Sequence, residues 1–196
     1  NLPFEIATSS GARYFDGQID EVRVWSDLRT TAEIRANMYR ELAGSEGNLL
    51  AYYKMSNGSG IALTDNTTAS TYDGVLKNTP TWRMSGAFSG PRNCLDFDGT
   101  DDYVDIGSGP GTVKTVAFWV YPSSTTEYFV DLDGGTHTIW SDGGTVTATG
   151  FSSPTIYVNG VETDTIAAGQ WQHVAVTTDT GINASDLDIG KAGSNY

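Results

Sequence analysis

Short runs of alternating apolar and polar residues recur along the chain, and turns rich in Gly, Asn, Asp, Ser and Thr separate them. In residues 102–106, Val104 and Ile106 fall on one side of an extended chain, while Tyr103 and Asp105 fall on the other. A period of two is typical of strands that bury one face. We predict strands over residues 19–25, 49–55, 102–106, 115–121, 155–158 and 171–177. The pattern predicts an all-β antiparallel sandwich of the jelly-roll kind.

One segment follows a helical period instead. Residues 30–33 (Thr-Thr-Ala-Glu) form a capping box, and Ile34, Met38 and Leu42 follow at a spacing of four. Gly44 then marks the end of the segment. We predict a helix of about three turns, and because its apolar stripe is narrow, we expect it to rest on the edge of the sandwich.

The chain also contains a weak internal repeat. Residues 4–7 (Phe-Glu-Ile-Ala) precede Tyr14, and residues 187–190 (Leu-Asp-Ile-Gly) precede Tyr196 in the same manner. The end of the sequence therefore leads into its own beginning. We interpret this as the frame of a repeat unit that is cut in mid-domain.

Composition narrows the class of partner. The chain has 24 acidic and 11 basic residues, a net charge of -13, which argues against nucleic acid because binding phosphates requires Lys and Arg. No run approaches the roughly eighteen apolar residues of a membrane helix, so we expect no membrane insertion. The acidic surplus suits a secreted protein or one that binds divalent cations, and it also promotes solubility by itself.

Several short sequence blocks have a recognisable order. They are residues 49–55, 73–76, 95–99, 102–104, 117–120, 156–160 and 169–176. Together they resemble the laminin-G-like jelly rolls of the concanavalin A-like lectin/glucanase class. The closing strand of such a domain resembles residues 15–25, which stand here at the front of the chain. The resemblance therefore implies the laminin-G-like fold in a circularly shifted frame.

This shifted frame leaves two arrangements open within one structural domain. We expect residues 1–47 to supply the closing strand and the helix, and residues 48–196 to supply the opening and central strands. The first segment either closes the sandwich of its own chain or is donated to a neighbouring copy by strand addition. Donation would build a head-to-tail filament or array.

The most concentrated polar group is a series of aspartates near the middle of the chain. We predict a structural calcium site at Asp20, Asp98 and Asp102, because alternation places Asp20 on the same face as Val22 and Val24, where an inward carboxylate needs a partner. The resemblance implies calcium as well, since members of the family hold one near such a seam. The alternative is that solvent or backbone amides satisfy these aspartates.

The sequence lacks the acid triplet of the related glycosidases. Laminarinase-type enzymes of this class place three acids on one strand face, and Glu162 and Asp164 are followed by Ile166 and Ala167 where a third acid is required. Without facing carboxylates, hydrolysis of a glycoside lacks its acid and its base or nucleophile. We therefore predict a protein that is not an enzyme.

Several aromatic residues and asparagine motifs are candidates for contact with carbohydrate or for glycosylation. Tyr128, Trp140, Tyr157 and Trp82 are candidates for stacking on sugars, although most aromatic residues fill cores or edges. Three asparagines, Asn57, Asn66 and Asn183, fit the N-glycosylation pattern.

The first hypothesis is an extracellular or cell-surface structural or adhesive repeat, whose partners are copies of itself or neighbouring repeats. The alternative is a carbohydrate-binding module of a larger secreted protein, with glycans as partners.

Overall fold

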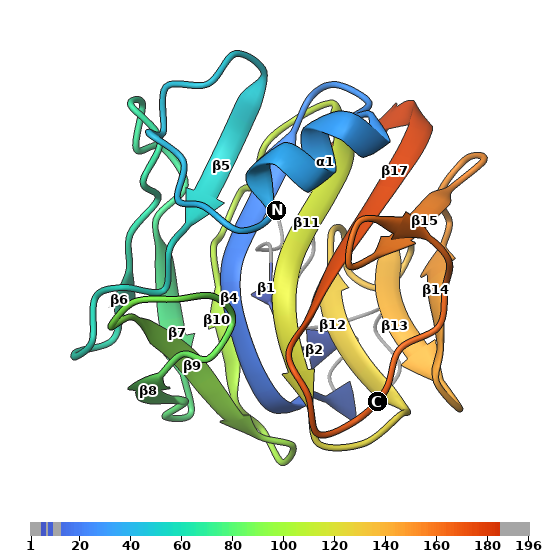
Figure 1. Ribbon diagram of the computed structural model, residues 1–196. Helices are drawn as coiled ribbons and strands as arrows, with labels where there is room; N and C mark the ends of the chain where they lie inside the picture. Colours follow the sequence, from blue (N-terminus) through green and yellow to red (C-terminus); the bar gives the residue numbers. More distant parts are fainter. Residues whose placement is uncertain (1–4, 7, 10–12, 185–196) are drawn as a thin grey trace.

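Two antiparallel sheets pack face to face in the computed structural model, which describes residues 5–184 apart from residues 7 and 10–12 (Figure 1). The predicted all-β sandwich is confirmed. Within the described residues the smaller sheet has seven strands, in the spatial order β14 (Thr145–Thr149), β13 (Thr138–Asp142), β12 (Glu127–Asp131), β1 (Glu5–Ile6), β10 (Tyr103–Asp105), β7 (Gly74–Lys77) and β6 (Ala62–Leu63).

The larger sheet has eight described strands. Seven follow the order β16 (Val161–Glu162), β15 (Thr155–Val158), β17 (Gln172–Ile182), β11 (Val113–Pro122), β4 (Asp16–Trp25), β9 (Asn93–Asp98) and β8 (Thr81–Met84). The eighth, β5 (Leu49–Tyr53), also pairs with β4. A separate short hairpin of β2 (Thr8–Ser9) and β3 (Arg13–Tyr14) completes the strands. Each predicted strand is present, with boundaries shifted by a few residues.

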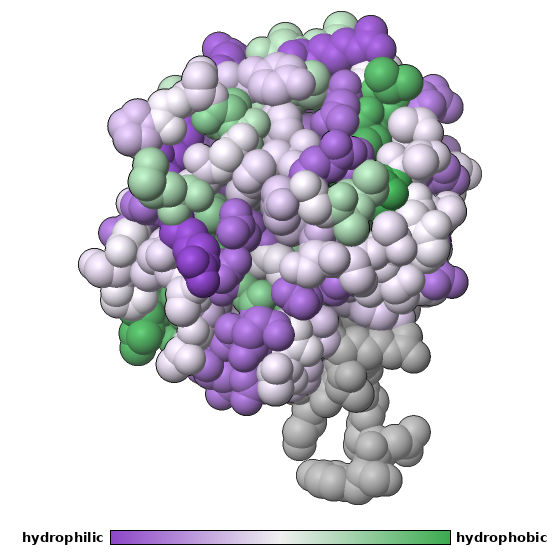
Figure 2. Space-filling view, turned by 60° about the horizontal axis from the view of Figure 1, so that its bottom comes forward, coloured by the Kyte–Doolittle hydropathy of each residue, from purple (hydrophilic) through white to green (hydrophobic). Residues whose placement is uncertain are grey.

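The core lies between the two sheets and follows from the alternation along the strands. On β11, Val116, Phe118 and Val120 are fully buried, and Phe118 meets Phe129 of the smaller sheet with ring centroids 5.8 Å apart. Val104 and Ile106 enter the same core, as their spacing predicts. On the face shown in Figure 2, hydrophobic residues occur in small groups among hydrophilic ones.

Strand β4, near the start of the chain, lies in the middle of the larger sheet. It pairs along its length with β11, and residues 16–19 pair on the other side with β9. Its position completes the sheet within this chain, as Figure 1 shows for the blue strand beside the yellow β11. The closing strand at the front of the sequence thus occupies a central place in the fold.

The helix α1 (Thr31–Asn37) begins at the predicted capping box. The Thr30 hydroxyl accepts a hydrogen bond from the Glu33 backbone N–H, and the Glu33 carboxylate accepts one from the Thr30 N–H (2.8 Å). The helix lies on the outer face of the larger sheet, where Ile34 packs against Ala117, Tyr157 and Ala175. The expectation that it would rest on the sandwich edge is therefore wrong.

The helix is also shorter than the predicted three turns. Side chains of the sheet hydrogen-bond the carbonyl groups around its C-terminus: Trp119 Nε1 donates to Met38 O (2.7 Å), and Arg23 donates to Asn37 O and Arg40 O. Leu42 lies outside the helix, and its backbone N–H donates to the Tyr52 hydroxyl. Tertiary partners thus replace the further helical turns that the spacing predicted.

A β-bulge in β4 overturns the predicted orientation of Asp20. The pairing between β4 and β11 shifts between Ala117 and Trp119, and Glu21 has a φ of 55°. The extra residue reverses the alternation, because a bulge leaves one residue unpaired. Asp20 therefore pairs with Trp119 on the outer face, while Val22 enters the core.

No helix of the described chain has the length and apolar character needed to cross a membrane.

Candidate functional site

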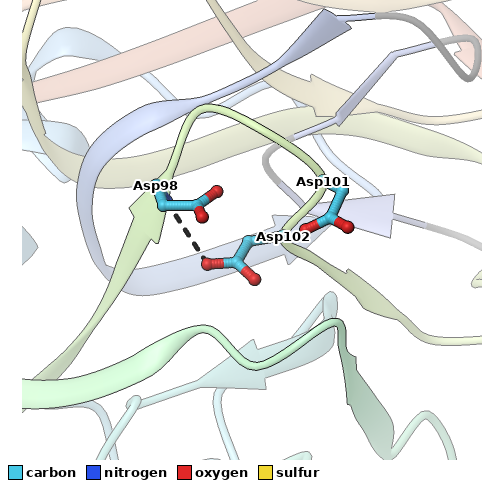
Figure 3. A group of neighbouring side chains, drawn as sticks. All are labelled: Asp98, Asp101 and Asp102. Atoms are coloured by element: carbon cyan, nitrogen blue, oxygen red, sulfur yellow. Dashed lines mark hydrogen bonds between the residues drawn. The ribbon is translucent and has the colours of Figure 1, made fainter.

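An acidic loop connects β9 to β10 and brings three carboxylates together. Oxygen atoms of Asp98, Asp101 and Asp102 all lie within 4.8 Å of one another. Figure 3 shows these side chains at the two ends of the loop, with Asp101 and Asp102 facing Asp98. Asp98 and Asp101 are exposed, whereas Asp102 is only 4 % exposed. The loop therefore presents an oxygen-rich cluster of the type that Ca²⁺ binds.

Asp102 is the buried member of this cluster. Its Oδ2 accepts a hydrogen bond from the Asp98 backbone N–H (3.3 Å), but its buried Oδ1 has no hydrogen-bond partner among the residues that the structure describes. Burial, together with the neighbouring charges of Asp98 and Asp101, raises the pKa of Asp102 to about 6. A bound cation would relieve both the desolvation and the repulsion.

Of the three predicted metal ligands, the structure brings Asp98 and Asp102 together but not Asp20. The Asp20 carboxylate instead accepts a hydrogen bond from the Ser85 hydroxyl (2.5 Å). Burial raises the pKa of Asp20 to about 7. Asp101 is the third member of the cluster. Its position in the same short loop as Asp98 and Asp102 is the sequence feature that could have identified it.

A second feature is an open groove on the outer face of the smaller sheet. Its volume is about 480 Å³, and Tyr14 of β3, Tyr128 of β12 and Trp140 of β13 line it. Tyr128 and Trp140 are cross-strand partners whose rings stack 5.3 Å apart at an interplanar angle of 9°. Each of the three aromatic side chains is half-buried. The groove thus has an aromatic floor that solvent can reach.

Polar groups surround this aromatic floor. Glu127 is buried, and its carboxylate accepts hydrogen bonds from the Asp16 backbone N–H (3.1 Å) and the Ser124 hydroxyl (2.8 Å). Burial raises the pKa of Glu127 above its usual range. Asp142 is exposed and accepts a hydrogen bond from the Thr126 hydroxyl (3.2 Å). Carboxylate and hydroxyl groups therefore stand beside the rings.

Gly99 links the groove to the acidic loop. It lines the groove and lies between Asp98 and Asp101 in the sequence. Its φ is +73°, its N–H donates to Phe15 O (3.1 Å), and a Cβ at this position would lie 2.8 Å from the Cβ of Asp16. The close approach and the left-handed conformation both require glycine here.

The other two predicted sugar-stacking residues lie elsewhere. The Trp82 indole donates to Gly60 O at the β8 edge, and Tyr157 is buried under α1. Tyr14 was not predicted, although it is the tyrosine of the internal repeat. Its place beside β12 depends on the β2–β3 hairpin, for which the apolar pattern gave no signal.

The glycosylation-pattern asparagines differ in accessibility. Asn57 and Asn183 are exposed. Asn66 is half-buried, and its side-chain oxygen accepts a hydrogen bond from the Lys54 N–H (3.2 Å). Two of the three therefore have an exposed side chain.

Comparisons with known proteins agree with this architecture. The laminin-G-like family model described as the concanavalin A-like lectin/glucanases superfamily matches residues 98–187. The match begins at the first residue of the acidic loop and includes Tyr128 and Trp140 of the groove. Searches of curated proteins and of solved structures found no match. The two-sheet sandwich and the family match together show that this chain carries a laminin-G-like jelly-roll domain of the concanavalin A-like superfamily.

Proposed function

We propose that this protein is a non-catalytic, extracellular adhesive module that binds carbohydrate in the groove of Tyr14, Tyr128 and Trp140. The observation that carries the proposal is the parallel Tyr128–Trp140 pair on an open sheet face, with Asp142 and Thr126 beside it. Aromatic faces pack against the C–H faces of a sugar ring, while carboxylate and hydroxyl groups accept hydrogen bonds from its hydroxyls.

The family and the size of the groove both support this function. Laminin-G-like domains are in general carbohydrate-binding or adhesive modules, are typically non-catalytic and are commonly extracellular. The groove volume of about 480 Å³ falls within the range of small-molecule sites. A short oligosaccharide is therefore the ligand that fits both the chemistry and the dimensions.

Calcium bound by Asp98, Asp101 and Asp102 is part of the same proposal. The ion would supply the missing partner of the buried Asp102 Oδ1 and fix the loop that contains Gly99. Because Gly99 also lines the groove, calcium would hold that wall of the sugar site in place. Its role is structural, and Asp20 is not among its ligands.

Assembly of neighbouring copies into an array by strand donation is the second function that we propose. Strand β1 lies between β10 and β12, with Ile6 in register with both Val104 and Val130. The repeat at residues 187–190 has the same apolar-acidic-Ile sequence pattern, so we propose that the corresponding segment of a neighbouring repeat would suit the same place. Light scattering over a range of concentrations tests this: association that increases with concentration supports donation, and a stably folded monomer throughout overturns it.

Binding of neutral oligosaccharides tests the first function. We expect hits on a glycan array and a measurable affinity by calorimetry for the strongest of them. Trp140→Ala should abolish this binding. Trp82→Ala removes a half-buried indole from β8, at the edge of the larger sheet, and should retain the binding. An array without hits, or equal loss of affinity in both variants, would contradict sugar binding in the groove.

A further inference from the structure

We propose that the groove selects glycans that carry protonated amino groups, such as oligomers of glucosamine, over neutral and acidic glycans. This inference rests on the proposed carbohydrate-binding function and adds a charge preference to it. It follows from the charges around the groove rather than from the aromatic floor alone.

The described residues that line the groove include two acids, Glu127 and Asp142, and no basic residue. Gly99 at the groove wall lies in the loop that carries the exposed Asp98 and Asp101. Among the residues described by the structure, no ion pair joins any of these four carboxylates to Lys or Arg. Among the described side chains, therefore, none compensates the negative charge at this site.

The hydrogen bonds of the two lining acids are made with neutral donors. Glu127 accepts from the Asp16 N–H and the Ser124 hydroxyl, and Asp142 accepts from the Thr126 hydroxyl. Such contacts orient the carboxylates without cancelling their charge. Asp142 is exposed at the rim, so a ligand can reach it directly.

An amino sugar matches both parts of the site. Its ring can lie on the Tyr128–Trp140 pair, and its ammonium group can pair with Asp142 while interacting with an aromatic face. A neutral sugar would make the stacking contact and hydrogen bonds from its hydroxyl groups, but not the ion pair with Asp142. A sulfated or uronic sugar would meet repulsion, which the net charge of -13 on the chain strengthens.

Calcium in the acidic loop would neutralise much of the charge on Asp98 and Asp101. The selectivity is therefore assigned to Asp142 and Glu127, and Asp142 is the residue to alter because Glu127 is buried among its own hydrogen-bond partners. The preference should persist in the presence of Ca²⁺.

Calorimetry on the full chain with three matched oligosaccharides tests the inference. The ligands are hexamers of glucosamine and of N-acetylglucosamine and a heparin hexasaccharide, at about pH 6 and low salt, with Ca²⁺ present. We expect the glucosamine hexamer to bind roughly ten-fold more tightly than its N-acetylated counterpart, and heparin not to bind. Raising the salt to about 500 mM should reduce that difference to two-fold or less.

Two charge-matched variants locate the effect. Asp142→Asn should remove most of the preference for the glucosamine hexamer, while Asp164→Asn, which neutralises an exposed carboxylate outside the groove, should leave it intact. Equal loss in the two variants would overturn the assignment to Asp142.

The results also separate this inference from the function on which it rests. Equal affinity for both hexamers, abolished in each case by Trp140→Ala, would overturn the charge preference and leave sugar binding in the groove intact. Tight binding of heparin would likewise overturn the preference. Absence of binding by either hexamer, together with a glycan array without hits, would overturn both.

Discussion

Buried aspartates in this protein differ in how well they are satisfied. Asp65 is 1 % exposed, and its carboxylate accepts hydrogen bonds from the backbone N–H groups of Tyr52, Thr67, Thr71 and Tyr72, as well as from the Thr67 hydroxyl. Asp20 is equally buried, but within the described part of the chain its Oδ2 accepts a hydrogen bond from the Ser85 hydroxyl and its Oδ1 has no hydrogen-bond partner. Substitution of the two residues should therefore change the free energy of unfolding in opposite directions.

Replacing Asp65 should be strongly destabilising. Asp65→Ala leaves several buried donors without an acceptor, which costs about 3 kcal/mol or more of the free energy of unfolding. Urea denaturation measures this loss, and the exposed Asp179→Ala provides the control. A loss for Asp65→Ala no larger than that for the control would contradict the role of Asp65 as an organiser of this loop.

Replacing Asp20 by its neutral isostere should instead stabilise the protein at neutral and alkaline pH. Burial raises the pKa of Asp20 to about 7 in the folded state, above the ordinary value of 3.8. As pH rises, the Asp20 carboxyl group loses its proton at a lower pH in the unfolded chain than in the folded protein. The Asp20 contribution to the free energy of unfolding therefore falls as pH rises from about 4 to 7 and then stays constant.

The comparison of wild type with Asp20→Asn isolates this contribution from the other acids. Thermal unfolding across the pH range should show similar melting temperatures near pH 4 and a higher one for the variant above pH 7. A variant that is less stable than wild type by the same amount at every pH would show that Asp20 does not carry this titration.

At the scale of elements, the helix shows how far local sequence determines structure. Its start depends on a capping box made by Thr30 and Glu33, and both were identified from the sequence. Its end depends on Trp119 and Arg23, which are distant in sequence and take the carbonyl groups of residues 37–40. The local signal thus predicted where the helix starts but not where it ends.

The start of the helix gives a modest and specific prediction. Thr30→Ala removes the N-cap acceptor and should cost about 1 kcal/mol of unfolding free energy. Thr31→Ala, one position inside the helix, should cost much less because alanine favours helix interiors. Denaturant unfolding compares the two, and an equal effect would argue against the capping interaction.

The strands show the same limit of sequence reasoning. Long strands such as β11 and β17 follow the period of two and were predicted, whereas two-residue strands such as β1 and β6 are too short to show a period. The bulge at Glu21 leaves no mark in the apolar pattern, so Asp20 was assigned to the wrong face. The acidic loop is local and could be found, but the groove combines β3, β12 and β13 and could not.

At the scale of the whole molecule, the net charge of -13 means that bound cations should stabilise the folded protein. We expect Ca²⁺ to raise the melting temperature and EDTA to reverse the increase, because binding to the folded state stabilises it. The effect should weaken below about pH 6, where Asp102 takes up a proton. Asp101→Asn should reduce the shift, while Asp20→Asn should retain it. An unchanged melting temperature with Ca²⁺ would rule out the site.

The central claim is that sugar binds on the aromatic groove of a laminin-G-like sandwich. The chain has five tryptophans, so indole N–H signals in a two-dimensional NMR spectrum can report each one separately once variants assign them. Titration with the strongest-binding oligosaccharide should shift the Trp140 indole signal and leave those of Trp82 and the buried Trp119 in place. A saturating ligand that leaves the Trp140 signal unmoved while shifting another would contradict the account.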